Sequence, residues 1–249
     1  MTAGERATLR RWTSLAQWVG TDRGVAAIDS VEEAWPGYAD TAARSILNAY
    51  YTDPHVIGAV WSWLAEHGVA EGVGFEPGCG RGDWIALAPP ALRFDGVDID
   101  PISVTVARAL TGENIAEARI EEWHIARSEQ ARVNGGYDVV VGNVPFSSQR
   151  PSTNNPHRDS LHNLAIGRSV AMLRPGGVAA VLTSRFSLDA GNPKWRQRTS
   201  AQVDLVAAFR LPSRTHREAG TDVVTDLLIL RRPHPGEARP TADWVDTTT

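Results

Sequence analysis

Residues 75–84, Phe-Glu-Pro-Gly-Cys-Gly-Arg-Gly-Asp-Trp, decide the fold of this 249-residue chain. An apolar run over residues 73–76 leads into alternating glycines, and a helical pattern follows them. Glycine lets the chain turn tightly, and its bare backbone lets a ligand approach closely at the positive end of the following helix. A strand, a glycine-rich turn and a helix in this order predict the ligand-binding unit of a doubly wound α/β sheet.

A second strand, over residues 94–98, follows at once and ends in the acidic segment Gly-Val-Asp-Ile-Asp-Pro. An acidic residue at this position, here Asp98, can accept hydrogen bonds from both hydroxyls of a ribose. The loop lacks the G-x-G-x-x-G spacing of dinucleotide sites, and Glu76 beside it would repel a pyrophosphate and attract a cation. We therefore expect S-adenosylmethionine rather than NAD; the alternative is that the glycines only shape a turn.

Short apolar runs bounded by Gly, Pro or Asp continue along the chain and predict buried strands with helices on both faces of the sheet. The expected strands cover residues 73–76, 94–98, 118–121, 137–141, 178–183, 203–209 and 224–230. Helical spacing predicts helices over 3–19, 39–50 and 54–66. We expect an N-terminal helical segment over 1–47, one α/β domain over 48–232 and a flexible tail over 233–249.

The composition narrows the class of protein further. The formal net charge is −4, and no apolar run approaches the roughly 18 residues of a membrane span. The single cysteine, Cys79, excludes an intrachain disulfide and a cysteine-cluster metal site. The seven histidines show no metal-ligand spacing. These observations predict a cytoplasmic protein that binds no membrane and no metal, in which Cys79 is a small packed side chain.

The fourth expected strand ends in residues 142–146, Gly-Asn-Val-Pro-Phe. The amide oxygen of Asn143 and the carbonyl of Val144 can accept the two N–H groups of an exocyclic amine, and Phe146 can stack on its base. Pro145 stiffens the turn. Because an activated methyl donor needs orientation rather than a base, this arrangement favours methyl transfer to an amine. The alternative is a plain strand-to-loop turn.

Together the segments YYTD, FEPGCGRGDW, GVDIDP and DVVVGNVPF resemble the N6-adenine DNA methyltransferases of the γ arrangement, whose catalytic tetrapeptide is N-P-P-Y/F. The chain is most similar to the methyltransferase domain fused to helicases in phage and plasmid antirestriction or modification proteins. That group shares N-V-P-F and the later LRPGGVAAVLTSRFSLD, AAFRLP and AGTDVVTDLLIL. The resemblance covers about residues 48–232 and implies the class I S-adenosylmethionine-dependent methyltransferase fold, Rossmann-like, with strand order 3-2-1-4-5-7-6.

The resemblance also implies roles for single residues. Tyr51 and Thr52 match the motif at the methionine end of the cofactor, and Glu122 is our choice for the adenine amine, with Glu121 nearly equivalent. The residues expected to bind the cofactor are Tyr51, Thr52, Glu76, Pro77, Gly78, Gly80, Asp98, Ile99, Glu122 and Asn143. Those expected to hold the target amine are Asn143, Val144, Pro145 and Phe146. Val144 replaces the first proline of the commoner motif, and Ser147 stands where a glycine usually follows.

Several further side chains have two interpretations. For His162 we favour a helix surface or cap over the cleft, and for Arg196 and Arg210 surface ion pairs over phosphate binding. For Trp84 and Trp123 we favour core packing over the adenine pocket. The polar segment 147–159 fits a lid, a DNA-contacting loop or a solvated loop equally well.

The partners follow from the same motifs. The charge of −4 and the short remainder outside 48–232 predict that the chain alone binds DNA weakly. A helicase-like or target-recognition partner would then supply most of the affinity for DNA. Two alternatives stay open: a methyltransferase acting on RNA or on a protein glutamine amide, and a non-catalytic antirestriction module.

Overall fold

Seven strands form one sheet in the order β3-β2-β1-β4-β5-β7-β6. The computed structural model describes residues 1–12, 51–145, 150–151, 153–213 and 224–246, and also 27, 29, 31, 33 and 36–38. The strands are β1 (Glu71–Pro77), β2 (Ala91–Asp98), β3 (Asn114–Glu117), β4 (Tyr137–Asn143), β5 (Leu173–Ser184), β6 (Asp204–Arg210) and β7 (Thr225–Arg231). The first five are parallel, and β7 lies antiparallel between β5 and β6. The expected fold class and strand order are confirmed.

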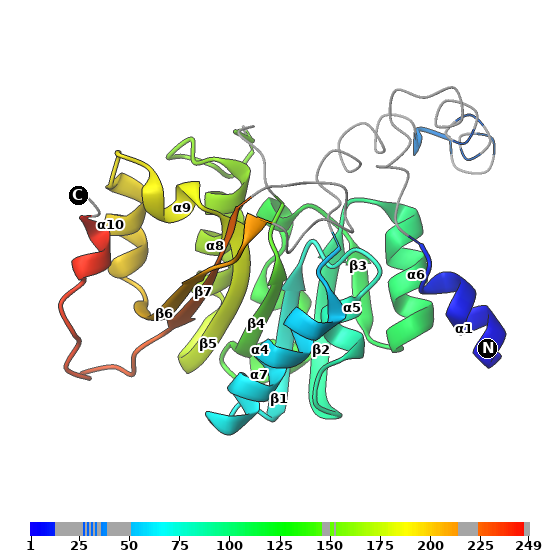
Figure 1. Ribbon diagram of the computed structural model, residues 1–249, viewed down its shortest axis with the longest axis horizontal. Helices are drawn as coiled ribbons and strands as arrows, with labels where there is room; N and C mark the ends of the chain where they lie inside the picture. Colours follow the sequence, from blue (N-terminus) through cyan, green and yellow to red (C-terminus); the bar gives the residue numbers. More distant parts are fainter. Residues whose placement is uncertain are drawn as a thin grey trace.

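Helices cover both faces of this sheet. The helices are α1 (Ala3–Leu9), α4 (Pro54–Glu66), α5 (Asp83–Ala86), α6 (Pro101–Thr111), α7 (Glu129–Val133), α8 (Leu161–Ala171), α9 (Phe186–Asp189) and α10 (Lys194–Ser200), with single 3-10 turns η3 (Ile120–Glu122), η4 (Ile125–Arg127) and η6 (Asp243–Val245). In Figure 1, α1 and α6 lie at the β3–β2 end of the sheet, and α9 and α10 lie at the β5–β7–β6 end.

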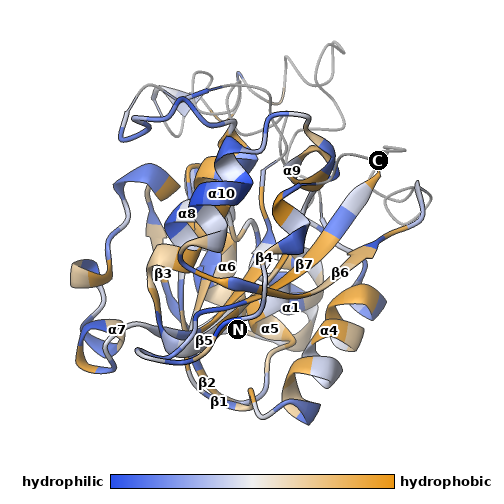
Figure 2. Ribbon diagram, turned by 90° about the vertical axis from the view of Figure 1, so that its left-hand side faces the viewer, coloured by the Kyte–Doolittle hydropathy of each residue, from blue (hydrophilic) through white to orange (hydrophobic). Residues whose placement is uncertain are grey.

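The core consists of two clusters, one on each face. In β4, Val140 belongs to the cluster that includes residues of α7, α8 and α10, whereas Val139 and Val141 belong to the cluster that includes residues of α4, α5 and α6. Successive side chains of a strand point to opposite faces, and here both faces are covered. The middle segments of β4 and β7 are therefore apolar on both faces, and Figure 2 shows β7 mostly in the hydrophobic colour.

Two aspartates begin the helices that flank the ligand edge of the sheet. Asp53 accepts a hydrogen bond from the His55 N–H at 2.7 Å and so caps α4, where Pro54 occupies the first turn. Asp100 caps α6 by accepting from the N–H groups of Ile102 and Ser103. Each cap fixes where its helix begins. The helix expected over residues 54–66 is confirmed.

The sheet leaves a crevice where its strand order reverses. β1 lies between β2 and β4, with the registers Pro77↔Val97 and Phe75↔Val140. The connections from β1 and β4 run in opposite directions, so the carboxyl ends of these two strands are the position where such sheets bind ligands.

The third strand differs from the expectation, and other expectations lie outside the described residues. The strand is β3 (Asn114–Glu117), not 118–121, because Asn114 and Ile115 pair with Asp95 and Gly96 of β2 and the chain then turns into η3. The alternation of apolar and polar residues over four positions is too short to distinguish a strand over 114–117 from one over 118–121. The helix expected over 3–19 is shorter: α1 ends at Leu9, with Arg10 as its C-cap. Residues 13–19 and the expected helix over 39–50 lie outside the described residues.

The expected flexible tail packs on the domain as far as residue 246. Arg239 donates to the Asp204 carboxylate at 2.9 Å and to the carbonyls of Ser200 and Ala201. Trp244 packs against the core cluster on the α8 side. Further contacts join Arg231 to Glu237 and Arg196 to the Val245 carbonyl. The composition of the segment did not reveal this attachment, because it depends on a few contacts with distant residues.

Among the described residues, no helix is both long and apolar enough to cross a membrane.

Candidate active site

The glycine-rich loop takes the backbone shape that its sequence predicts. Gly78, Gly80 and Gly82 have φ angles of 68°, 52° and 80°, a region that disfavours other residues. A side chain at Gly80 would place its Cβ 3.2 Å from the ring of Tyr51. The Gly80 N–H donates to Asp98 at 2.8 Å, which fastens the loop to the end of β2.

Asp98 is the polar centre of this edge. One carboxylate oxygen accepts from the Gly80 N–H at 2.8 Å, and the other accepts from the Asp100 N–H at 2.9 Å. Burial raises the pKa of Asp98 to about 6, although these hydrogen bonds act in the opposite direction. The carboxylate is thereby held in a fixed orientation with acceptor capacity left for a ligand.

Glu76 is a buried carboxyl group that lacks a full set of partners. Its residue is 2% exposed, and its Oε2 has no hydrogen-bond partner among the described residues. Burial, and then the negative charges of Asp83 and Asp98, raise the pKa of Glu76 well above its ordinary value. A side chain at Gly142 would place its Cβ 3.2 Å from Glu76 Cγ, so β4 leaves just enough room for this group. Such an unsatisfied acidic group fits a ligand with a cationic or donor group.

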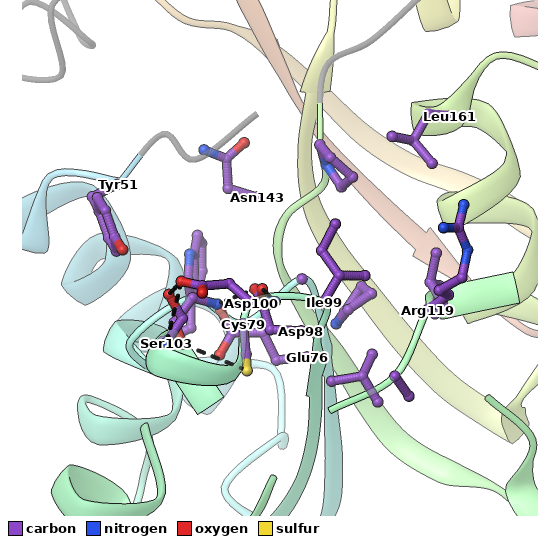
Figure 3. Close-up of a pocket in the computed structure, with 18 of the residues that line it drawn as sticks. Tyr51, Glu76, Cys79, Asp98, Ile99, Asp100, Ser103, Arg119, Asn143 and Leu161 are labelled. Atoms are coloured by element: carbon purple, nitrogen blue, oxygen red, sulfur yellow. Dashed lines mark hydrogen bonds between the residues drawn. The ribbon is translucent and has the colours of Figure 1, made fainter. Parts of the chain in front are cut away.

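One cavity joins these residues. It is lined by Tyr51, Thr52, Glu76, Pro77, Gly78, Cys79, Gly80, Asp83, Trp84, Val97, Asp98, Ile99, Asp100, Ser103, Ala118, Arg119, Ile120, Glu121, Asn143, Pro145, Pro151 and Leu161. Figure 3 shows Tyr51 on one side, Arg119 and Leu161 on the other, and Glu76 and Asp98 between them. All the expected cofactor residues except Glu122 therefore line one cavity.

The wall at Tyr51 is fixed by Arg81. The Arg81 guanidinium lies 4.4 Å from the Tyr51 ring centroid and pairs with Asp83 at 2.8 Å. It also donates to the carbonyl of Trp12 at 2.8 Å, which connects the N-terminal segment to this wall. Beside Tyr51, the hydroxyl of buried Thr52 has no partner among the residues that the structure describes.

The structure places Glu121, rather than Glu122, in the cavity wall. Glu121 is 2% exposed and accepts from Arg119 Nε at 2.7 Å. Residues 120–122 form a 3-10 turn, in which consecutive side chains point about 120° apart because each turn has three residues. Only one of two adjacent glutamates can then face the cavity, and the sequence spacing could not decide which.

Glu121→Gln is expected to weaken S-adenosylmethionine binding about fivefold or more, because the amide replaces a charged acceptor. Glu122→Gln is the matched control and is expected to change the Kd less than about twofold. Titration calorimetry on both variants tests the assignment, and equal Kd values would contradict it.

The candidate amine site meets the cofactor loop. Asn143 and Pro145 line the cavity, and Pro145 Cδ lies 3.6 Å from the Cβ position of a side chain at Gly78. Val144 is oriented differently: its side chain is 1% exposed in the core, and its N–H donates to the Leu182 carbonyl at 3.0 Å. The role of its carbonyl stays a prediction, and Phe146 and Ser147 lie outside the described residues.

Sequence reasoning missed or misjudged part of the cavity wall. Ala118 and Ile120 fell within the misplaced third strand, Pro151 belongs to the polar segment 147–159, and Leu161 follows that segment. Trp84 is buried as expected, yet it also lines the cavity, and its indole N–H has no partner in the described part of the chain. No local pattern in the sequence signals these positions, because contacts distant in the chain create them.

The other side chains with two interpretations are now placed. Trp123 packs in the core and donates to the Tyr137 hydroxyl at 3.1 Å. Arg210 pairs with Asp189 and Asp226, as expected. Arg196 does not form the expected surface ion pair. It is 2% exposed and donates to the carbonyls of Ala190 and Val245, and burial lowers its pKa.

His162 is buried rather than on a helix surface, and its Nε2 lies 3.0 Å from the hydroxyl of Ser160, the N-cap residue of α8. Cys79 is buried, and burial raises the pKa of its thiol. The described residues contain no group of three or more His, Cys, Asp or Glu side chains able to hold a metal ion.

Cofactor affinity is expected to fall about tenfold between pH 7.5 and pH 5, since a ligand that needs ionised Asp98 competes with a proton at a pKa of about 6. The sign follows from the raised pKa: the carboxylate form is fully present only above it. Calorimetry across this pH range measures the change, with Asp98→Asn as the comparison, which should bind weakly at every pH. A Kd independent of pH would contradict this role.

The fold and the position of the cavity define the class: the chain has the class I S-adenosylmethionine-dependent methyltransferase fold. It is similar to a class I S-adenosylmethionine-dependent methyltransferase structure from Listeria monocytogenes, with a TM-score of 0.60, 15% identity and coverage of 94% of this chain and 82% of that one. It is also similar to a modification subunit of a type I restriction enzyme from Vibrio vulnificus YJ016, with a TM-score of 0.57, 14% identity and coverage of 90% and 51%.

Two curated proteins are related in sequence. Defense against restriction protein B of Escherichia phage P1 is 27% identical over 224 residues, which are 86% of this chain and 10% of that protein. Ribosomal protein L11 methyltransferase of Deinococcus radiodurans is 34% identical over 104 residues, which are 39% of this chain and 33% of that protein. The chain thus spans about a tenth and a third of these relatives. No family model matches.

Proposed function

We propose that the chain is an S-adenosylmethionine-dependent methyltransferase that methylates the N6 amine of adenine in DNA. The observation that carries the proposal is that Asn143 and Pro145 line the same cavity as Glu76 and Asp98. The amide of Asn143, which can accept a hydrogen bond from an amine, is therefore in the same cavity as the acidic residues that can bind a cationic nucleoside. Orientation of two reactants in one cavity is what a direct methyl transfer requires of an enzyme.

The donor set fits this cofactor, which would supply a methyl group already activated for transfer. Glu76, with its unpartnered Oε2, would face the positively charged methionine end, and Asp98 would accept from the ribose hydroxyls. Glu121 would accept from the adenine amine. Ile99 and Ile120 supply apolar surface for the ring. The cationic end, the ribose hydroxyls and the adenine amine of the cofactor would thus each have a matching acceptor.

At the other end of the cavity, the amide oxygen of Asn143 would accept an N–H of the target amine. This hydrogen bond orients the nitrogen lone pair toward the methyl group and stabilises the positive charge that develops on nitrogen. When bound, the cofactor would supply the methyl group and keep the electron pair of its carbon–sulfur bond, and the amine held by Asn143 would release one proton to solvent. The γ order, in which the cofactor loop precedes the catalytic loop in the chain, fits the sequence.

DNA is the proposed substrate because the names of two similar proteins refer to restriction, a process that acts on DNA. One is a phage protein for defence against restriction, and one is a modification subunit of a restriction enzyme. A helicase-like or target-recognition partner belongs to the proposal, because one similar protein is named as a subunit of a restriction enzyme. A second candidate function is methylation of a protein, and the match to a ribosomal-protein methyltransferase is the observation that supports it.

Incorporation of tritiated methyl groups distinguishes these functions. The chain is incubated with labelled S-adenosylmethionine and with single-stranded DNA, duplex DNA, RNA or ribosomal protein in parallel. The proposal expects label in DNA, recovered as N6-methyladenine after digestion. Label in RNA or protein alone would reassign the substrate, and cofactor binding without transfer to any of them would favour a non-catalytic antirestriction module.

A further inference from the structure

A second groove lies at the same edge of the sheet as the cavity. It is lined by Arg150, His157, Arg158, Asp159, Ser160, His162, Asn163, Ser184, Phe186, Ala190, Asn192, Lys194, Trp195 and Arg198. Ser184 ends β5, two residues after Leu182, the neighbour of Asn143 in the sheet. The groove is therefore beside the strand that carries the candidate amine site.

One chain segment separates the groove from the cavity. Pro151 and Leu161 line the cavity, whereas their chain neighbours Arg150, Ser160 and His162 line the groove. The segment is fastened on the cavity side, because the Asn154 amide donates to the carbonyl of Glu121 at 3.0 Å. A ligand in the groove and a base in the cavity would thus be adjacent.

Positive charge gathers in the groove although the whole chain carries a net charge of −4. Four cationic side chains line it, namely Arg150, Arg158, Lys194 and Arg198, and Asp159 is the one acid among its described lining residues. Arg198 and Asp159 pair with each other at 2.5 Å. Arg150, Arg158 and Lys194, the only lysine in the sequence, are exposed. The groove thus attracts an anion with several charges.

The backbone of the wall is held in an unusual shape. Asn154 and Arg158 have positive φ angles of 50° and 54°, which side-chain-bearing residues adopt at a cost. Asn155, which is buried, holds this turn by donating to the Pro151 and Asp159 carbonyls at 3.0 and 2.8 Å. The turn fixes the place where the exposed Arg158 side chain leaves the backbone.

Phe186 supplies an exposed aromatic surface in this basic groove. It is 55% exposed at the start of α9, and the Arg185 guanidinium lies 4.9 Å from its ring centroid. An exposed ring among cations is the combination by which proteins hold unpaired bases and the phosphates between them. Figure 2 shows the neighbouring α10 as mostly hydrophilic.

We propose that this groove binds a single nucleic-acid strand next to the target base. An unpaired base flanking the target stacks on Phe186, and Arg150, Arg158 and Lys194 contact the phosphates. The inference rests on the proposed function for the identity of the strand as DNA. It adds that the substrate is unpaired around the target and that this chain itself holds the flanking nucleotides.

Fluorescence anisotropy with a labelled DNA strand of about 12 nucleotides tests the groove, since such strands match the usual site sizes of single-strand binders. Phe186→Ala is expected to raise the Kd about fivefold or more, and Phe186→Trp to preserve it. Arg158→Gln with Lys194→Gln should reduce the slope of log Kd against log salt concentration by about 0.7 for each phosphate that the protein no longer neutralises.

The matched controls lie elsewhere on the molecule. Phe209→Ala removes a ring that is 49% exposed on the edge strand β6, and Arg132→Gln neutralises an exposed cation on α7. Both should leave the Kd unchanged. No binding by the wild-type chain, equal effects of control and groove variants, or a Kd at least as low for the matching duplex would each overturn the proposal.

Cofactor calorimetry on every variant separates a groove effect from misfolding. An RNA strand of the same sequence and a methyl-transfer assay separate the two proposals. Binding of either strand that depends on Phe186 supports the groove even if no methyl group reaches DNA. Methyl transfer that continues in the wild type without any dependence of binding on Phe186 overturns the groove and leaves the proposed function standing.

Discussion

Asn143→Ala is expected to reduce methyl transfer about 100-fold or more, while S-adenosylmethionine still binds with a Kd within about threefold of the wild type. The loss follows because Asn143 lines the cavity at the end of β4 and its amide oxygen is the proposed acceptor for the target amine. Cofactor binding persists because Glu76, Asp98 and the glycine-rich loop stand on other strands. Single-turnover methyl incorporation and calorimetry measure the two quantities separately.

The matched control is Asn134→Ala. Asn134 donates to Gly136 and Asp138 near the amino end of β4, away from the cavity, and its loss should leave the transfer rate unchanged. Undiminished transfer by Asn143→Ala would exclude the assigned role. A loss of cofactor binding as large as the loss of rate would instead place Asn143 in the cofactor site.

Glu76→Gln is expected to produce opposite effects on stability and on binding. The ligand-free variant should melt about 2–4 °C higher than the wild type at pH 7.5, and its affinity for S-adenosylmethionine should fall about 10- to 100-fold. Stability rises because glutamine removes a buried acid that Asp83 and Asp98 repel. Affinity falls because the cationic end of the cofactor loses its charged partner.

The pH dependence of this stability effect has a defined sign. The pKa of Glu76 is raised in the folded chain, so the wild type loses stability relative to Glu76→Gln as pH rises above the ordinary carboxyl pKa. The difference in Tm should therefore vanish near pH 4 and be present at pH 7.5. Glu117→Gln, an exposed substitution on β3, is the control in the same scanning calorimetry. A ligand-free variant that melts lower than the wild type at pH 7.5 would contradict the interpretation.

The parts of the fold that follow from local patterning could be predicted. Central strands such as β4 are largely apolar along their length, and the helix from Pro54 carries its own cap at Asp53, so neighbours in the sequence suffice to define them. The third strand was misplaced because residues 114–117 and 118–121 alternate similarly. Its position depends on pairing with β2, which is a contact between distant segments.

The same distinction divides the candidate site. Glu76, Gly78, Gly80 and Asp98 were predictable because each follows directly from a strand end and a turn. The choice of Glu121 over Glu122 was not, because a 3-10 turn sets the direction of each side chain. Arg196 was misread because two separate segments bury it: the carbonyl of Ala190 at the end of α9 and that of Val245 in the C-terminal segment accept its hydrogen bonds.

The sequence by itself determined the class of this protein: a strand, a glycine turn, an acidic strand end and an asparagine strand end, in that order, which parallel pairing must bring to one edge. The tertiary structure alone decided what surrounds those residues, namely the closing wall at Glu121, Pro151 and Leu161 and the basic groove at Phe186. The physical reason is the separation along the sequence of the residues that interact. Backbone turns and strand ends are set by neighbours in the chain, whereas walls and grooves arise where segments far apart in the sequence pack together.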